Sequence, residues 1–166
     1  MKINIQYVKE GSHSFVFEKN LYDLNLVDSQ IFVNDIHIEG HLEKRDKNIY
    51  VTTLIDTQVE YTCDKCLSKF VVNLNDTFHV LFTWDQAYAE CESDEAVEMI
   101  KPNTGEIDLA PSVRESLLLA IPMKVVCSEN CKGLCSGCGV DLNEETCRCE
   151  QEKIDPRWNE LKKLIR

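Results

Sequence analysis

Eight of the nine cysteines in this 166-residue chain form four close pairs, and cysteine thiolates are ligands for zinc and other soft metal ions. The pairs are Cys63 with Cys66, Cys127 with Cys131, Cys135 with Cys138, and Cys147 with Cys149. The first residues alternate in polarity, and we expect no export signal. We therefore interpret the pairs as metal or redox groups rather than structural disulfides, and Cys91 as an incidental thiol.

The last two pairs predict one compact zinc site. Cys135-Ser-Gly-Cys138-Gly139 has the form of a zinc knuckle, in which glycines permit positive φ and let backbone amides point at the sulfurs. Cys147-Arg-Cys149 follows after eight intervening residues and supplies two more thiolates. Four thiolates complete a tetrahedral zinc site.

The other two pairs predict a second zinc site. Cys63 and Cys66 have no second pair nearby in the sequence, so we expect them to join Cys127 and Cys131 across a long loop. A different partition would draw one site from the six tail cysteines and leave Cys63 and Cys66 as free thiols. We predict two zinc ions.

Cys63-x-x-Cys66 also has the spacing of a redox motif. In thioredoxin-type proteins the first cysteine lies at a helix N-terminus, which lowers its pKa. Here two strand-like segments flank the motif, which favours metal binding. A redox-active or thiol-sensing protein is the alternative function.

The elements that carry Cys63 and Cys66 are predicted strands. Apolar and polar side chains alternate over residues 49–63 and again over 70–82, so the two segments form a hairpin with the cysteines at its turn. Upstream, Ile31 and Val33 differ in parity from Ile36 and Ile38, which predicts a β-bulge between them.

We expect an α+β fold, mainly an antiparallel β-sheet or partly open barrel, with one or two helices and a cysteine-rich zinc-binding C-terminal segment. Residues 1–122 form the β-rich core, with an acidic loop at 85–98 and a helix at 109–121. Asp108 is the expected N-cap, and Val113, Leu117, Leu118 and Ala120 form an apolar stripe. Residues 123–166 form the zinc-binding tail, which ends in a short helix.

The charge distribution restricts where nucleic acid could bind. The chain carries a net charge of −11, which disfavours binding to a phosphate backbone. Residues 1–150 hold 13 basic and 26 acidic side chains, whereas residues 151–166 hold five and three. Any contact with RNA or a partner is therefore expected at Arg157, Trp158, Lys162 and Lys163.

Several function classes find no support in the sequence. No apolar run is long enough to span a membrane, so we expect no membrane association. The four histidines lack metal-ligand spacing, and phosphate-binding loops and nucleophile elbows are absent. We expect a protein that is not an enzyme and has no small-molecule substrate.

A series of short motifs resembles the YceD family over roughly residues 60–166. They are Cys63-x-x-Cys66-Leu67, Ile107-Asp108-Leu109, Leu119-Ala120-Ile121-Pro122, the spacing from Cys127 to Cys149, Leu142-Asn143, Asp155-Pro156-Arg157-Trp158 and Leu161-Lys162-Lys163-Leu164. The resemblance implies a non-catalytic, cytoplasmic role in 23S ribosomal RNA accumulation or processing during large-subunit biogenesis. Implied partners are large-subunit ribosomal RNA or a pre-ribosomal particle, reached through a basic ribosomal protein or directly.

Overall fold

The fold comes from a computed structural model that describes residues 1–26, 31–86 and 96–149. Cys91, the four expected contact residues from Arg157 to Lys163, and the expected C-terminal helix lie outside the described residues. None of the described helices is both long and apolar enough to cross a membrane.

The chain divides into two compact units, and the division passes through a β-hairpin. Unit 1 contains residues Met1–Tyr61 and Val71–Met123. Unit 2 contains Thr62–Phe70 and the chain from Lys124 onward. The hairpin turn, which carries Cys63 and Cys66, thus groups with the cysteine-rich segment rather than with the strands that lead into it.

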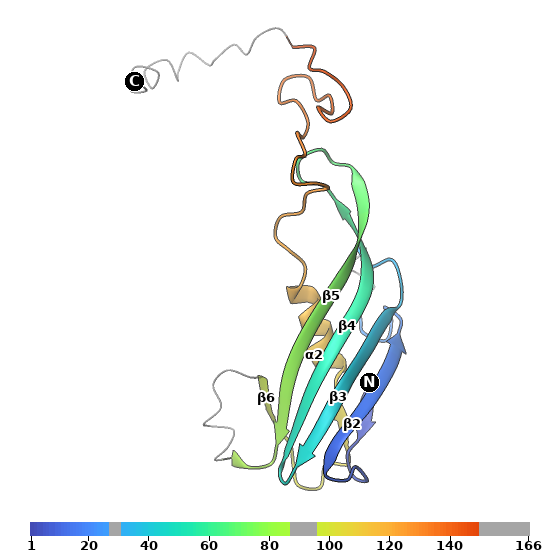
Figure 1. The fold of residues 1–166 in the computed structure, drawn as a ribbon, viewed down its shortest axis with the longest axis vertical. Helices are drawn as coiled ribbons and strands as arrows, with labels where there is room; N and C mark the ends of the chain where they lie inside the picture. Colours follow the sequence, from blue (N-terminus) through green and yellow to red (C-terminus); the bar gives the residue numbers. More distant parts are fainter. Residues whose placement is uncertain (27–30, 87–95, 150–166) are drawn as a thin grey trace, which may run out of the picture. The chain divides into compact units, whose positions relative to one another are not determined.

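Unit 1 contains a five-stranded sheet with linear order β2-β3-β4-β5-β6 (Figure 1). The strands are β2 (Gly11–Lys19), β3 (Ile36–Arg45), β4 (Asn48–Thr62), β5 (Lys69–Thr83) and β6 (Ala96–Met99), and β4 and β5 run on into the hairpin of unit 2. Pairs β2–β3 and β3–β4 are antiparallel, whereas β6 joins β5 in parallel. The expectation of a mainly antiparallel sheet is thus confirmed, and the described strands form no closed barrel.

The core of unit 1 lies between one face of this sheet and a single described helix, α2 (Ala110–Leu119) (Figure 1). On β4 the inward residues Ile49, Val51, Ile55 and Val59 are at most 1% exposed, which confirms the predicted alternation. Val113 and Leu117 of α2 are fully buried, while Leu119 is 77% exposed. The Ser116 hydroxyl donates to the Asp76 carboxylate of β5, linking helix and sheet.

A second, two-stranded sheet is formed by β1 (Lys2–Asn4) and β7 (Glu106–Asp108). Because β7 leads directly into α2, the helix begins at Ala110, one residue later than predicted. Asp108 is paired with Lys2, so it belongs to a strand and cannot be the N-cap, which is Leu109. The Asp108 carboxylate still accepts the Ala110 N–H, at 3.0 Å. The helix ends at Leu119, two residues before the predicted end.

Two further local predictions are wrong. Phe32, rather than its neighbours, points into the core: it is 6% exposed and Val33 is 52% exposed. Phe32 pairs with Val59, and His37 pairs with Asp56. Between these two pairs the upstream chain has two more residues than β4, whereas the predicted bulge would add one. Because the excess is even, Phe32 faces the same side of the sheet as Ile36 and Ile38. The expected acidic loop also ends early, because residues 96–98 belong to β6.

Gly40 marks a close approach between strands that a larger residue would disrupt. A Cβ atom there would overlap the Thr52 carbonyl oxygen and lie 2.7 Å from Phe15 Cζ. We expect Gly40→Ala to lower the free energy of unfolding by about 1–3 kcal/mol in urea titrations followed by circular dichroism. Gly105→Ala is the control, because its nearest atom, Gln6 Oε1, is 3.7 Å away. Equal stability of the two variants would contradict this packing.

Candidate metal centre

The first cluster consists of Cys63, Cys66, Cys127 and Cys131, whose sulfurs all lie within 4.8 Å of one another. The Sγ atoms of Cys63 and Cys131 are 3.8 Å apart, and those of Cys66 and Cys127 are 3.6 Å apart. Cys63, Cys66 and Cys131 are buried and pack against Phe70, Val126 and Leu134. The structure thus brings the hairpin pair to the first tail pair, as the preferred partition predicted.

Backbone geometry forms the first half of this cluster. The Leu67 N–H donates to the Cys63 carbonyl at 2.9 Å, which closes the Cys-x-x-Cys turn. Leu67 has φ +61°, a left-handed conformation that costs a non-glycine residue about 1–2 kcal/mol. The N–H groups of Lys65 and Cys127 both point at Cys63 Sγ, each at 3.4 Å.

These donors change the acidity of the thiols in the first cluster. Burial opposes ionisation of Cys63, but backbone N–H groups, led by that of Cys127, outweigh it and lower the pKa of Cys63 to about 6. The hydrogen bond with Cys131 is the largest cause that raises the pKa of Cys127 to about 12. Ionisation is thus favoured at Cys63 and opposed at Cys127. A divalent cation would take the place of the Cys127 proton.

The second cluster consists of Cys135, Cys138, Cys147 and Cys149, again with all sulfurs within 4.8 Å. Cys135 Sγ lies 3.3 Å from Cys147 Sγ and 3.8 Å from Cys149 Sγ. These four cysteines include three exposed residues, so the second cluster is more accessible to solvent than the first. It occupies a single stretch of 15 residues, as predicted.

The glycines of the second cluster have two different roles. Gly139 has φ +74° and donates its N–H to the Cys135 carbonyl at 2.9 Å, matching Leu67 in the first turn. At Gly137 the constraint is steric instead, because a Cβ atom there would lie 2.6 Å from Cys149 Sγ. The predicted positive φ is therefore confirmed at Gly139 but not at Gly137.

The thiols of the second cluster also divide into ionised and protonated members. The backbone N–H groups of Cys138 and Gly137 are the main causes that lower the pKa of Cys135 to about 6. The hydrogen bond with Cys138 is the largest cause that raises the pKa of Cys149 to about 12. In both clusters ionisation is favoured at one sulfur and opposed at another, whose proton a bound metal ion would displace.

The sulfur spacing fits a tetrahedral metal site in both clusters. Zinc–sulfur bonds of about 2.3 Å give sulfur–sulfur edges of about 3.8 Å in a regular tetrahedron. Two edges of the first cluster are 3.6 and 3.8 Å long, and two edges of the second are 3.3 and 3.8 Å long. Disulfide bonds need about 2.05 Å, so these are separate thiols. Each cluster could hold one metal ion.

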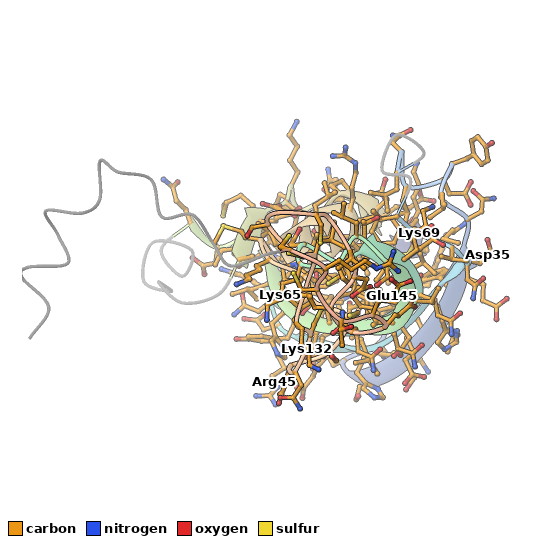
Figure 2. The ribbon with its side chains drawn as sticks, turned by 90° about the horizontal axis from the view of Figure 1, so that it is seen from above. Asp35, Arg45, Lys65, Lys69, Lys132 and Glu145 are labelled. Carbon is orange, nitrogen blue, oxygen red and sulfur yellow. The ribbon has the colours of Figure 1, made fainter. Side chains whose placement is uncertain are left out.

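The two clusters differ in which charge prevails among the residues near them in sequence. Four sulfur ligands around a divalent ion carry a net charge of −2, which nearby cations stabilise. Within three residues of the first-cluster cysteines, lysines outnumber acids: Lys65, Lys69, Lys124 and Lys132 against Glu60, Asp64 and Glu129. Near the second cluster the acids prevail: Asp141, Glu144 and Glu145 against Arg148. Figure 2 labels Lys65, Lys132 and Glu145 of unit 2, and Lys65 Nζ donates to the Cys131 carbonyl at 3.1 Å.

Two residues of unit 2 were not identified from the sequence as parts of the centre. Leu67 has the left-handed conformation directly after Cys66. The sequence indicates this only by analogy, because Gly139 holds the same position after Cys138 in the other Cys-x-x-Cys turn. Asn143 Nδ2 lies 3.4 Å from Cys131 Sγ, although Asn143 belongs to the loop of the second cluster. The sequence Asp141-Leu-Asn143 is typical of a turn, but it does not indicate a contact between Asn143 and Cys131.

A family model for the large ribosomal RNA subunit accumulation protein YceD matches residues 51–165, a range that includes all eight paired cysteines. The chain belongs to the YceD family. The resemblance of the sequence motifs to this family is thereby confirmed.

Relatives of this YceD chain occur in distant bacteria and in plants. An uncharacterized protein of Mycobacterium bovis is 28% identical over 131 residues, which are 78% of this chain and 62% of the relative. YlbN of Bacillus subtilis, also uncharacterized, is 26% identical and is covered over 89% of its length, with 92% of this chain. The Arabidopsis thaliana chloroplastic YCED homolog 1, named a large ribosomal RNA subunit accumulation protein, is 35% identical over 63 residues, 38% of this chain and 20% of that protein. No solved structure matches this chain.

Gly137 provides a selective test of the second cluster of this YceD protein. We expect Gly137→Ala to weaken metal binding at the second cluster about tenfold, because its Cβ would displace Cys149 Sγ. Ser136→Ala, in the same turn, is the matched control. Metal content after dialysis against graded chelator would show the difference, and equal retention by both variants would contradict the tight fit at Gly137.

Proposed function

We propose that this YceD protein is a non-enzymatic factor that supports the accumulation or processing of 23S ribosomal RNA during large-subunit biogenesis. The observation that carries this proposal is the family match over residues 51–165. The name of the Arabidopsis relative points to the same process. Assembly of the large subunit places the proposed role in the cytoplasm.

We further propose that each cluster holds one zinc ion, giving two ions per chain. Four thiolates are a soft donor set that favours zinc over magnesium or calcium. The described part of unit 2 has few apolar residues to bury, so metal binding would supply much of its folding free energy. The proposed ligands are the four sulfurs of each cluster, and their role is to fold this unit.

The redox alternative has less support from the geometry. A reactive cysteine must be reached by its disulfide partner, yet Cys63 is fully buried. Its sulfur lies 3.8 Å from that of Cys131, well beyond the about 2.05 Å of a disulfide bond. A low pKa at Cys63 suits a metal ligand equally well, because metals also bind the thiolate.

The proposed contact with RNA or a ribosomal partner lies at Arg157, Trp158, Lys162 and Lys163. Residues 151–166 carry a net positive charge, whereas the rest of the chain is strongly acidic. An acidic body repels naked RNA but attracts basic proteins. We therefore propose that a basic ribosomal protein or a pre-ribosomal particle brings the basic tail to the RNA.

Metal analysis tests the two-ion proposal. We expect the reduced protein to hold close to two zinc ions, and Cys135→Ser with Cys138→Ser to hold one while the sheet of unit 1 stays folded. Cys63→Ser with Cys66→Ser should be more destabilising, because it removes the ligands that hold the tail segment to the hairpin. Plasma emission spectroscopy measures the zinc content, and thermal unfolding measures the stability of each variant. A single ion in the unmodified protein would contradict the partition.

Depletion of the protein in its own host tests the cellular role. We expect the ratio of 23S to 16S ribosomal RNA to fall, and the unmodified gene to restore it. A variant with Arg157→Ala, Lys162→Ala and Lys163→Ala should restore it poorly while retaining both metal ions.

The matched control replaces Lys2, Lys9 and Lys101 with alanine, which removes the same charge far from the tail in sequence. An unchanged RNA ratio on depletion would contradict the proposed function. Full rescue by the tail variant would contradict only the contact site.

A further inference from the structure

Asn143 joins the loop of the second cluster to a sulfur of the first. It lies between Cys138 and Cys147, which are both proposed ligands of the second metal. Its Nδ2 donates to Cys131 Sγ at 3.4 Å, and its Oδ1 accepts the Lys132 N–H at 2.8 Å. Both ends of one side-chain amide thus engage the Cys131–Lys132 segment.

The loop holds Asn143 in this position through its own hydrogen bonds. Asp141 Oδ1 accepts from the Asn143 backbone N–H at 2.8 Å and from Nδ2 at 2.7 Å. The two hydrogens of the Asn143 amide are therefore shared between Asp141 and Cys131, which fixes the amide orientation. This turn would dock Asn143 in a single geometry.

Backbone contacts tie the same loop to the chain that follows Cys131. The Leu142 N–H donates to the Gly133 carbonyl at 3.0 Å, and Leu134 forms an antiparallel bridge with Asp141. Cys135 in turn donates its N–H to the Val140 carbonyl at 2.8 Å. The residues that close the second cluster and those that support Cys131 thus form one hydrogen-bonded assembly.

We propose that Asn143 is a positioning residue that couples the two metal sites, so that filling the second cluster strengthens metal binding at the first. This rests on the proposed function insofar as both clusters hold metal. A metal bound by Cys138 and Cys147 fixes both ends of the loop that presents Asn143. The amide then donates to the Cys131 sulfur, where an N–H donor stabilises the negative charge of a metal-bound thiolate.

The coupling has a defined direction and size. Loss of a hydrogen-bond donor next to a metal ligand lowers metal affinity by about 10- to 100-fold. Without metal in the second cluster, the loop between Cys138 and Cys147 is no longer held at its ends. The Asn143 amide would then lose its hydrogen bond to the Cys131 sulfur. Thermodynamic linkage makes the effect reciprocal, so loss of metal from the first cluster also weakens the second.

A double-mutant cycle on the full-length, zinc-loaded protein tests this coupling. The perturbations are Asn143→Ala and the loss of the second site through Cys147→Ser with Cys149→Ser. Release of zinc from the first cluster to excess chromogenic chelator is followed in each. We expect each change alone to speed that release about tenfold, and the combination to be no faster than either.

Two further variants separate coupling from general damage. Asn130→Ala makes the same change at an exposed asparagine next to Cys131 and should leave the release rate unchanged. Asn143→Asp keeps an acceptor for the Lys132 N–H but removes the donor to Cys131, so it should release zinc at least as fast as Asn143→Ala. A rate like that of the unmodified protein in either Asn143 variant would overturn the proposal, as would additive effects in the cycle.

Cadmium-113 NMR supplies a readout that a merely structural role would not change. The resonance of the first cluster is the one that Cys63→Ser with Cys66→Ser removes. We expect Asn143→Ala to shift that resonance and Asn130→Ala to leave it in place, because only Asn143 donates to a ligand sulfur. An unmodified protein without bound metal would overturn the metal proposal itself. Two bound ions with an unshifted resonance in Asn143→Ala would overturn only the coupling.

Discussion

The convergence of four sulfurs on one point is the constraint on which the rest of unit 2 depends. Cys63 and Cys131 are 68 residues apart in sequence, yet their sulfurs are 3.8 Å apart. Closing such a loop has an entropic cost that the three partly buried apolar neighbours of the cluster offset only in part. Strong metal–thiolate bonds are the kind of interaction that can offset the remainder, and they require the left-handed turn at Leu67.

The two units of the chain use different sources of stability. Unit 1 buries fully apolar residues of β3, β4 and α2 between a sheet and a helix, so the hydrophobic effect suffices. Up to Cys149, unit 2 has turns, short backbone contacts and a small cluster of buried cysteines in place of a core of that size. The dependence of unit 2 on metal would make it the part of the molecule that responds to zinc supply, and Asn143 would make that response a joint property of both clusters.

The charge pattern gives the family membership a physical interpretation. A strongly acidic protein is poorly suited to bind naked RNA, which agrees with the proposed contact through a basic partner protein. Within unit 2 the first cluster has lysines near it in sequence, while the second has acids. The buried cluster thus has more cations near it in sequence to compensate the charge of a tetrathiolate site.

The sequence by itself determined the hairpin of β4 and β5, the inward faces of those strands, and the local set of four cysteines that forms the second cluster. These features follow from local periodicity and from the short range over which a knuckle forms. Tertiary structure decided what depends on pairing between distant segments. Pairing with Lys2 keeps Asp108 in a strand, and a two-residue excess before β3 buries Phe32. Contact between loops brings Asn143 to Cys131, because hydrogen bonds across the fold leave no periodic trace in the sequence.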